Sequence, residues 1–164
     1  MKEKSEYDQK RNNNVNMMET KFDTIYDGEG NIVNSKLSDM IDTFLNDTTT
    51  KMDLYCADRY YYVTAKGLLS ACVLLLIESY PKQNYSMHGL YKLFQDAGKR
   101  GGNEGGILAG LDMIFSEMRL KRPETGCLQI YDGFRRFVSD RIATEVIISI
   151  GIGLNKFNIS DSLQ

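Results

Sequence analysis

The fold is decided by the stretch Arg59-Tyr-Tyr-Tyr-Val-Thr-Ala-Lys-Gly-Leu-Leu-Ser-Ala-Cys-Val-Leu-Leu-Leu-Ile-Glu-Ser79. From Leu68 to Ile77 it would be apolar on nearly every side of a helix, which is typical of a helix buried in the middle of a domain. Asp58 can cap its start, and Pro81 stops its continuation. The apolar run is about half of the roughly 20 residues that a membrane span needs, so we expect a core helix without membrane contact.

Apolar residues at three- and four-residue spacing predict further helices on both sides of this stretch. Ser86, and Ser139 or Asp140, fit as N-caps, and Pro123 fits a first helical turn. The expected ranges are 35–46, 86–97, 107–120, 123–138 and 139–154. Residues 98–106 hold five glycines and are expected to form a loop. The pattern therefore predicts an all-α bundle of about six helices.

The chain before the first helix divides into two parts. Residues 1–21 are polar and rich in Lys, Glu and Asn, so we expect a disordered arm or linker. One all-α domain is expected over residues 22–160. It begins with Thr24–Val33, where a Gly-rich turn between two β-prone pieces predicts a small hairpin. The turn imitates a calcium-binding loop, but Ile32 occupies the position that needs glycine, which favours a simple turn.

Composition limits the classes of function. The 164 residues suit one domain, and a formal net charge of −2 is unlike the basic balance of dedicated nucleic-acid binders. Any contact with DNA would have to come from a local basic cluster. Cys56, Cys72 and Cys127 have no metal-ligand spacing, and His88 is the only histidine. We expect Cys72 in the core, no bound metal or cofactor, and a reducing cytosolic compartment.

No catalytic motif is complete. Gly98–Gly106 resembles a phosphate-binding loop, but Lys99 is followed by Arg100 where a P-loop has Ser or Thr. Gly151-Ile-Gly153 lacks the third glycine of a dinucleotide-binding turn, because Lys156 stands there. The carboxylates lie on helix faces expected to be solvated, and Ser70 and Ser149 lie in apolar helices without a histidine nearby in sequence. We therefore expect this fragment not to be an enzyme.

Basic residues form local groups with acidic residues between them. One interpretation is that they are solvated helix ends that complement helix dipoles. The other is that they contact a partner protein or DNA. The candidate contact residues are Lys99, Arg100, Arg119, Lys121, Arg122, Arg135, Arg136 and Arg141. The aromatic run Tyr60–Tyr62 has similar alternatives, because one or two of its rings must face the core and the others could stack against a partner.

Four motifs in order resemble the all-α domain of type IV coupling proteins, the TraG/TraD-type ATPases of conjugative DNA transfer, in their Gram-positive-like form. The motifs are Asp58-Arg-Tyr-Tyr61, Lys66-Gly-Leu-Leu69, Leu111-Asp-Met-Ile-Phe-Ser-Glu117 and Ile148-Ser-Ile-Gly-Ile-Gly-Leu-Asn-Lys-Phe157. The resemblance covers residues 22–160. This chain departs from the family at Arg59, Tyr61 and Gly153, where the family has proline, tryptophan and arginine.

The resemblance implies a role in recruitment. Such a domain is an insertion in a membrane-anchored, hexameric ATPase and faces the cytoplasm, where it docks a relaxase or a relaxosome accessory protein for transfer. The isolated domain is expected to be a monomer. The alternative function is a helical DNA-binding domain that uses the local basic residues, because the family also resembles the helical domain of tyrosine recombinases.

Overall fold

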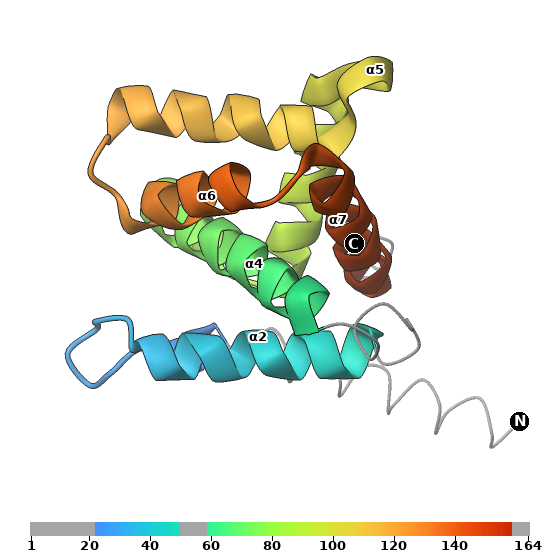
Figure 1. Ribbon diagram of the computed structural model, residues 1–164. Helices are drawn as coiled ribbons and strands as arrows, with labels where there is room; N and C mark the ends of the chain where they lie inside the picture. Colours follow the sequence, from blue (N-terminus) through green and yellow to red (C-terminus); the bar gives the residue numbers. More distant parts are fainter. Residues whose placement is uncertain (1–21, 50–58, 159–164) are drawn as a thin grey trace, which may run out of the picture.

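The computed structural model describes residues 22–49 and 59–158, and this part of the chain is all-α, as predicted (Figure 1). It has five α-helices rather than six: α2 (Asn34–Thr49), α4 (Arg59–Ser79), α5 (Met87–Lys121), α6 (Gly126–Phe137) and α7 (Asp140–Leu154). Two short 3-10 helices, η1 (Asp23–Ile25) and η2 (Lys82–Asn84), precede α2 and α5. The expected arm 1–21 and the expected cap Asp58 lie outside the described residues.

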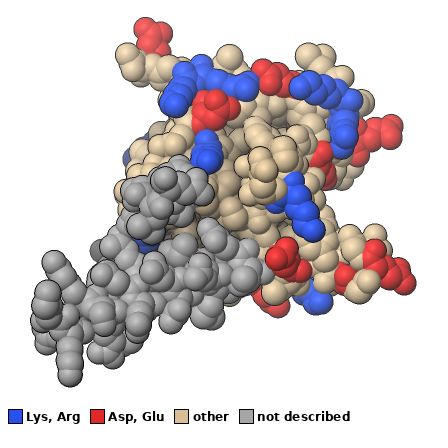
Figure 2. Space-filling view, turned by 180° about the vertical axis from the view of Figure 1, so that it is seen from behind, with Lys and Arg blue, Asp and Glu red and all other residues tan. Residues whose placement is uncertain are grey.

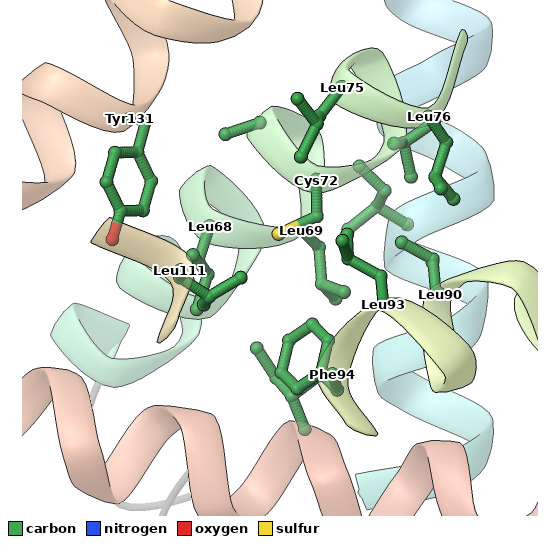
Figure 3. Packing of buried hydrophobic residues seen from close by; sticks show 14 of the residues in the cluster. Leu68, Leu69, Cys72, Leu75, Leu76, Leu90, Leu93, Phe94, Leu111 and Tyr131 are labelled. Carbon is green, nitrogen blue, oxygen red and sulfur yellow. The ribbon is translucent and has the colours of Figure 1, made fainter. Parts of the chain in front are cut away.

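Helix α4 is the centre of the core. It contacts α2, α5, α6 and α7, and its inner side chains are at most 1 % exposed. Figure 3 shows the packing of the leucines and Cys72 of α4 against α5 and α6; the labelled residues are Leu68, Leu69, Cys72, Leu75, Leu76, Leu90, Leu93, Phe94, Leu111 and Tyr131. Cys72 is fully buried, which confirms its predicted core position, and this burial raises the pKa of its thiol well above the ordinary value.

Helix α4 is also long and apolar enough to be compared with a membrane-spanning helix. Among the described residues it is the one helix that could cross a membrane by those two criteria, and half of its most apolar window is buried in the fold. A helix buried in the core of a domain is also apolar on nearly every side, because other helices cover it.

The predicted loop at residues 98–106 is wrong for most of its length. The helix that begins at Met87 continues through Lys99 and Arg100, and its backbone leaves helical geometry only at Gly102 and Gly106, with φ of +67° and +62°. Only glycine adopts this left-handed region without strain. Helix α5 is therefore two helical halves that meet at a sharp bend, and Figure 1 shows them running in different directions.

Close contact between the halves of α5 explains the other glycines. A Cβ atom on Gly110 would lie 1.7 Å from the backbone oxygen of Ala97, which is far inside van der Waals contact. The glycine at this position therefore allows two backbone segments to approach closely at the bend. The sequence had suggested a flexible loop instead.

The N-terminal segment forms less strand than predicted. One antiparallel bridge joins Tyr26 and Ile32 in place of a hairpin with two strands. The Asp27 carboxylate accepts hydrogen bonds of 2.9 Å from the backbone amides of Glu29 and Asn31, and these bonds lower its pKa, chiefly the one from Asn31. The carboxylate closes a turn, in agreement with the interpretation preferred over a calcium loop.

Two of the predicted N-caps, Ser86 and Ser139, begin helices as expected, whereas α2 begins at Asn34, one residue before its predicted start. The Ser86 hydroxyl accepts from the Gly89 amide at 3.1 Å, and the Ser139 hydroxyl accepts from the Ile142 amide at 3.3 Å. Pro123 is not in a first helical turn: it lies in the connection between α5 and α6, and α6 begins three residues later at Gly126. Helix α2 also runs beyond the predicted residue 46, to Thr49.

A polar link joins α2 to α4. The Tyr62 hydroxyl donates to Asp42 at 2.5 Å, and the Lys66 ammonium lies 2.9 Å from the same carboxylate. Burial alone would raise the pKa of Asp42, but the bonds from Tyr62 and Lys66 outweigh burial and lower it. A carboxyl with a lowered pKa in the folded state stabilises the fold above its unfolded pKa of about 3.9.

We predict that Gly110→Ala destabilises the protein by about 1–3 kcal/mol, because the added methyl must push the two halves of α5 apart. Gly133→Ala in α6 is the matched control. Nothing lies within 4 Å of its added Cβ, so alanine should stabilise the helix by about 0.5–1 kcal/mol. Chemical denaturation of both variants measures the difference, and equal effects would contradict the close approach.

We predict that Asp42→Asn lowers the free energy of unfolding at pH 7, and that the difference from the wild type shrinks as the pH falls through about 4 and below. The sign follows from the lowered pKa of Asp42: protonation removes the favourable charge from the wild type, whereas the variant has no carboxylate at this position to lose. Urea titrations from pH 7 to pH 3 give the difference at each pH. The exposed Asp39→Asn serves as a control, with an effect within about 0.5 kcal/mol at pH 7. A pH-independent difference for Asp42→Asn would refute this assignment.

Candidate partner-binding surface

The eight basic candidates are spread over three helices and one connection. Lys99, Arg100, Arg119 and Lys121 lie on α5, Arg122 follows it, Arg135 and Arg136 lie on α6, and Arg141 lies on α7. Figure 2 shows Lys and Arg side chains alternating with Asp and Glu along the rim of one face. The structure therefore does not bring the eight residues together into one continuous basic surface.

Three of these arginines form links, one between the two halves of α5 and two from α5 or its end to neighbouring helices. The Arg100 guanidinium lies 3.1 Å from Asp96 and 2.7 Å from Glu117, on opposite sides of the bend in α5. The bond to Glu117 is the main reason that the pKa of Arg100 is raised. Arg119 forms an ion pair with Asp132 of α6. Arg122 donates to the backbone oxygen of Glu78 at the end of α4, at 2.7 Å.

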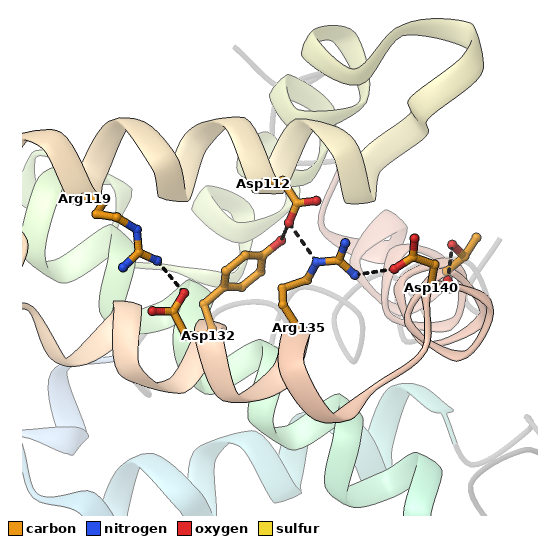
Figure 4. A network of polar contacts seen from close by, with 7 residues as sticks. Asp112, Arg119, Asp132, Arg135 and Asp140 are labelled. Atoms are coloured by element: carbon orange, nitrogen blue, oxygen red, sulfur yellow. Dashed lines mark hydrogen bonds and ion pairs between the residues drawn. The ribbon is translucent and has the colours of Figure 1, made fainter.

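Arg135 belongs to a network that joins three helices (Figure 4). Its Nε lies 3.0 Å from Oδ1 of Asp112 on α5, and its Nη1 lies 2.7 Å from Oδ1 of Asp140 on α7. Tyr131 donates to the same Asp112 oxygen at 2.6 Å, and its ring stacks on Phe115 with centroids 3.9 Å apart. The network holds the end of α6 against α5 and the start of α7.

The network also shifts the protonation of its members. The pKa of Tyr131 is strongly raised, first by burial and then by its bond to the Asp112 carboxylate. Burial would lower the pKa of Arg135, but its bond to Asp140 and the charge of Asp112 raise it overall. Tyr131 thus remains a hydrogen-bond donor and Arg135 a cation at physiological pH. These groups serve as structural links in the fold.

Few of the basic candidates remain available to a ligand. Arg141 pairs with Glu145 at 3.5 Å, although its side chain is 89 % exposed. Lys99, Lys121 and Arg136 have no carboxylate oxygen of a described residue within 4.0 Å. Most of the basic residues that the sequence suggested as a contact surface therefore form links within or between helices. Lys99, Lys121 and Arg136 are the three that do not, among the described residues.

Groups that could perform covalent or metal chemistry are few in the described residues. No three His, Cys, Asp or Glu side chains in residues 22–49 and 59–158 lie close enough together to hold a metal ion. Burial raises the pKa of the Cys127 thiol to about 12, so that thiol is protonated at neutral pH. The ring Nδ1 of His88 lies 3.1 Å from the backbone oxygen of Phe157 and holds the end of the domain in place.

Sequence reasoning missed a group of exposed apolar side chains where α4 begins, α6 ends and α7 passes. We call this surface the α4–α6–α7 corner and define it by Tyr60, Val63, Phe137 and Ile148. Phe137 is 76 % exposed, although it is a large aromatic residue. The aromatic run Tyr60–Tyr62 was the available signal: Tyr61 and Tyr62 are half-buried, while Tyr60 is exposed.

Comparisons with protein-family models, with curated proteins and with solved structures gave no match for this chain. The fold therefore defines the class of this protein as an all-α domain.

We predict that Arg135→Gln destabilises the protein by about 1 kcal/mol, because Asp112 and Asp140 lose a charge-assisted partner. Arg136→Gln is the matched control: it changes the adjacent arginine, which is exposed and has no ion pair among the described residues, and should have an effect within about 0.5 kcal/mol. Thermal or urea unfolding of both variants measures the difference. A larger loss for Arg136→Gln than for Arg135→Gln would show that the network does not hold the helices.

Proposed function

We propose that this chain is the cargo-recruitment domain of a conjugative coupling protein, which docks a relaxase or a relaxosome accessory protein for the motor of the parent ATPase. Support comes from where the four resembling motifs lie. Many residues of the second, third and fourth motifs lie in core positions or in links between helices of one bundle, which is what a shared fold requires of motif residues. In the first motif, Tyr60 is exposed and Tyr61 donates to Glu145 of α7.

The third motif, residues 111–117, illustrates this support. Its apolar members Leu111, Ile114 and Phe115 are at most 5 % exposed. Its two acidic members are the carboxylates of the links described above: Asp112 accepts from Tyr131 and Arg135, and Glu117 pairs with Arg100. Each motif residue named here therefore has a structural reason for its chemical type.

The fourth motif, residues 148–157, ends the domain in the same way. Ser149, Ile150, Gly153, Leu154 and Phe157 are buried, and they place α7 and the turn after it against the rest of the bundle. Gly153, one of the three departures from the family pattern, lies in this buried face. The departure therefore concerns a buried position of α7.

A recruitment domain has to bind its cargo protein but does not have to catalyse a reaction. A domain tethered to a motor raises the local concentration of its cargo at the motor entrance, even when the docking affinity is modest. If the contacts between domain and cargo are partly polar, the cargo can be released when the motor acts. In this proposal the domain faces the cytoplasm from a membrane-anchored hexamer, and nucleotide hydrolysis belongs to the parent ATPase.

The alternative, a DNA-binding domain, has weaker support. Neutralisation of phosphates supplies most of the affinity of such proteins, and it needs several available cations on one surface. Five of the eight basic candidates are already bonded to carboxylates or to a backbone oxygen. The observation that still favours DNA is the availability of Lys99, Lys121 and Arg136.

We predict that the purified chain binds a relaxase or accessory protein of its own conjugative element with a Kd in the micromolar range, and that it hydrolyses no ATP. Calorimetric titration of each purified relaxosome protein measures the affinity. A relaxase from an unrelated element is the control and should not bind. Absence of binding to every relaxosome protein at tens of micromolar would refute the proposal. Steeply salt-dependent binding to DNA alone would favour the alternative.

A further inference from the structure

Exposed apolar side chains concentrate on one side of the fold. Seven large hydrophobic residues are exposed in the described part of the chain, and five of them belong to α4, α6 and α7. These five, with their exposed fractions, are Tyr60 (44 %), Val63 (56 %), Phe137 (76 %), Ile148 (56 %) and Ile152 (54 %). Scattered exposed apolar residues are ordinary on a protein surface, whereas a cluster of them marks an interaction site.

Two hydrogen bonds bring these three helices together at the α4–α6–α7 corner. The Tyr60 hydroxyl donates to the backbone oxygen of Phe137 at 3.3 Å, which joins the start of α4 to the end of α6. The Tyr61 hydroxyl donates to Glu145 of α7 at 3.0 Å. Val63 lies one turn after Tyr60, and Ile148 lies one turn after Glu145, so each is a helix-surface neighbour of a residue in these bonds.

Three arginines lie close to these apolar side chains along the chain. Arg59 and Arg136 directly precede Tyr60 and Phe137 in sequence, and neither has a carboxylate of a described residue within 4.0 Å. Arg141 is 89 % exposed, and its pair with Glu145 spans 3.5 Å. Exposed pairs of this kind are weak and exchange readily for a better partner.

Two nearby carboxylates already bind other groups of the fold. Glu145 accepts from Tyr61 as well as pairing with Arg141, and Asp140 is bonded to Arg135. The corner is therefore an apolar surface with a positive rim. Its complement is an apolar segment with a negative rim.

We propose that the α4–α6–α7 corner binds a short acidic amphipathic segment of a partner protein. Its apolar side chains would cover Phe137 and Tyr60, and its carboxylates would pair with Arg59, Arg136 and Arg141. This proposal rests on the proposed recruitment function, in which the segment belongs to the cargo. Aromatic and arginine side chains of this kind provide much of the binding energy at protein interfaces.

The same surface suits DNA less well. Single strands bind along a positive groove with bases stacked on aromatic rings, and aliphatic side chains such as Val63 and Ile148 add nothing to stacking. The apolar face of a partner's amphipathic helix, in contrast, can pack against both aliphatic and aromatic side chains. A protein segment therefore uses the whole corner, and a nucleic acid would use only part of it.

The test uses the whole chain and a fluorescein-labelled amphipathic peptide of Leu and Glu, read by fluorescence anisotropy. The control peptide has Lys at every Glu position. We expect micromolar binding of the Glu peptide and binding at least ~10-fold weaker for Phe137→Ser, for Arg136→Glu and for the Lys peptide. Leu120→Ser and Lys121→Glu are matched controls on α5: Leu120 is 87 % exposed, and these variants should bind within about twofold of the wild type.

Several results would overturn the proposal. The first is equal affinity of the chain for the Glu and Lys peptides. The second is an unchanged affinity of Phe137→Ser for the Glu peptide when its melting temperature is also unchanged. The third is displacement of the Glu peptide by single-stranded DNA. Relaxosome binding separates the two proposals. If a relaxosome protein binds the wild type and Phe137→Ser equally well, the corner is the wrong surface and recruitment stands. If the Glu peptide binds as predicted and no relaxosome protein does, the corner stands and recruitment is wrong.

Discussion

The burial of α4 is the constraint on which the rest of the structure depends. A helix that is apolar on nearly every side must be removed from water on nearly every side, so one neighbour cannot satisfy it. Helices α2, α5, α6 and α7 all contact it. The bend in α5 follows from the same requirement, because it allows one element to contribute buried side chains from two directions, including Leu93 before the bend and Leu111 after it.

Charged groups are arranged around this core in a way that bears on function. Arg100, Arg119 and Arg135 reach carboxylates that hold helices or helix halves in place. Their charges are therefore largely balanced within the fold, and the basic residues visible in the sequence overstate the charge that a ligand would meet. The α4–α6–α7 corner is different, because it combines exposed apolar side chains with two arginines, Arg59 and Arg136, that pair with no carboxylate of the described residues. This contrast is why we favour protein docking over DNA binding.

Local signals in the sequence predicted much of the fold. The apolar run of α4 and the serines at positions 86 and 139 act within one helix, so their effects could be read without tertiary information. The continuity of α5 could not, because a glycine that permits flexibility and a glycine that permits a close backbone approach look alike in a sequence. Several links of the basic candidates also depend on carboxylates far away in the sequence, such as Asp132 for Arg119 and Glu117 for Arg100. The exposure of Phe137 depends on which neighbours cover it.

Hydrogen exchange of the α4 backbone amides tests the central claim most directly. If α4 is enclosed by all its neighbours, its amides from residue 65 to residue 77 exchange only when the whole domain unfolds, with a free energy of exchange equal to that of global unfolding. The amides of α2, which covers one side only, exchange through smaller openings. Exchange of the α4 amides as fast as those of α2 would contradict the account.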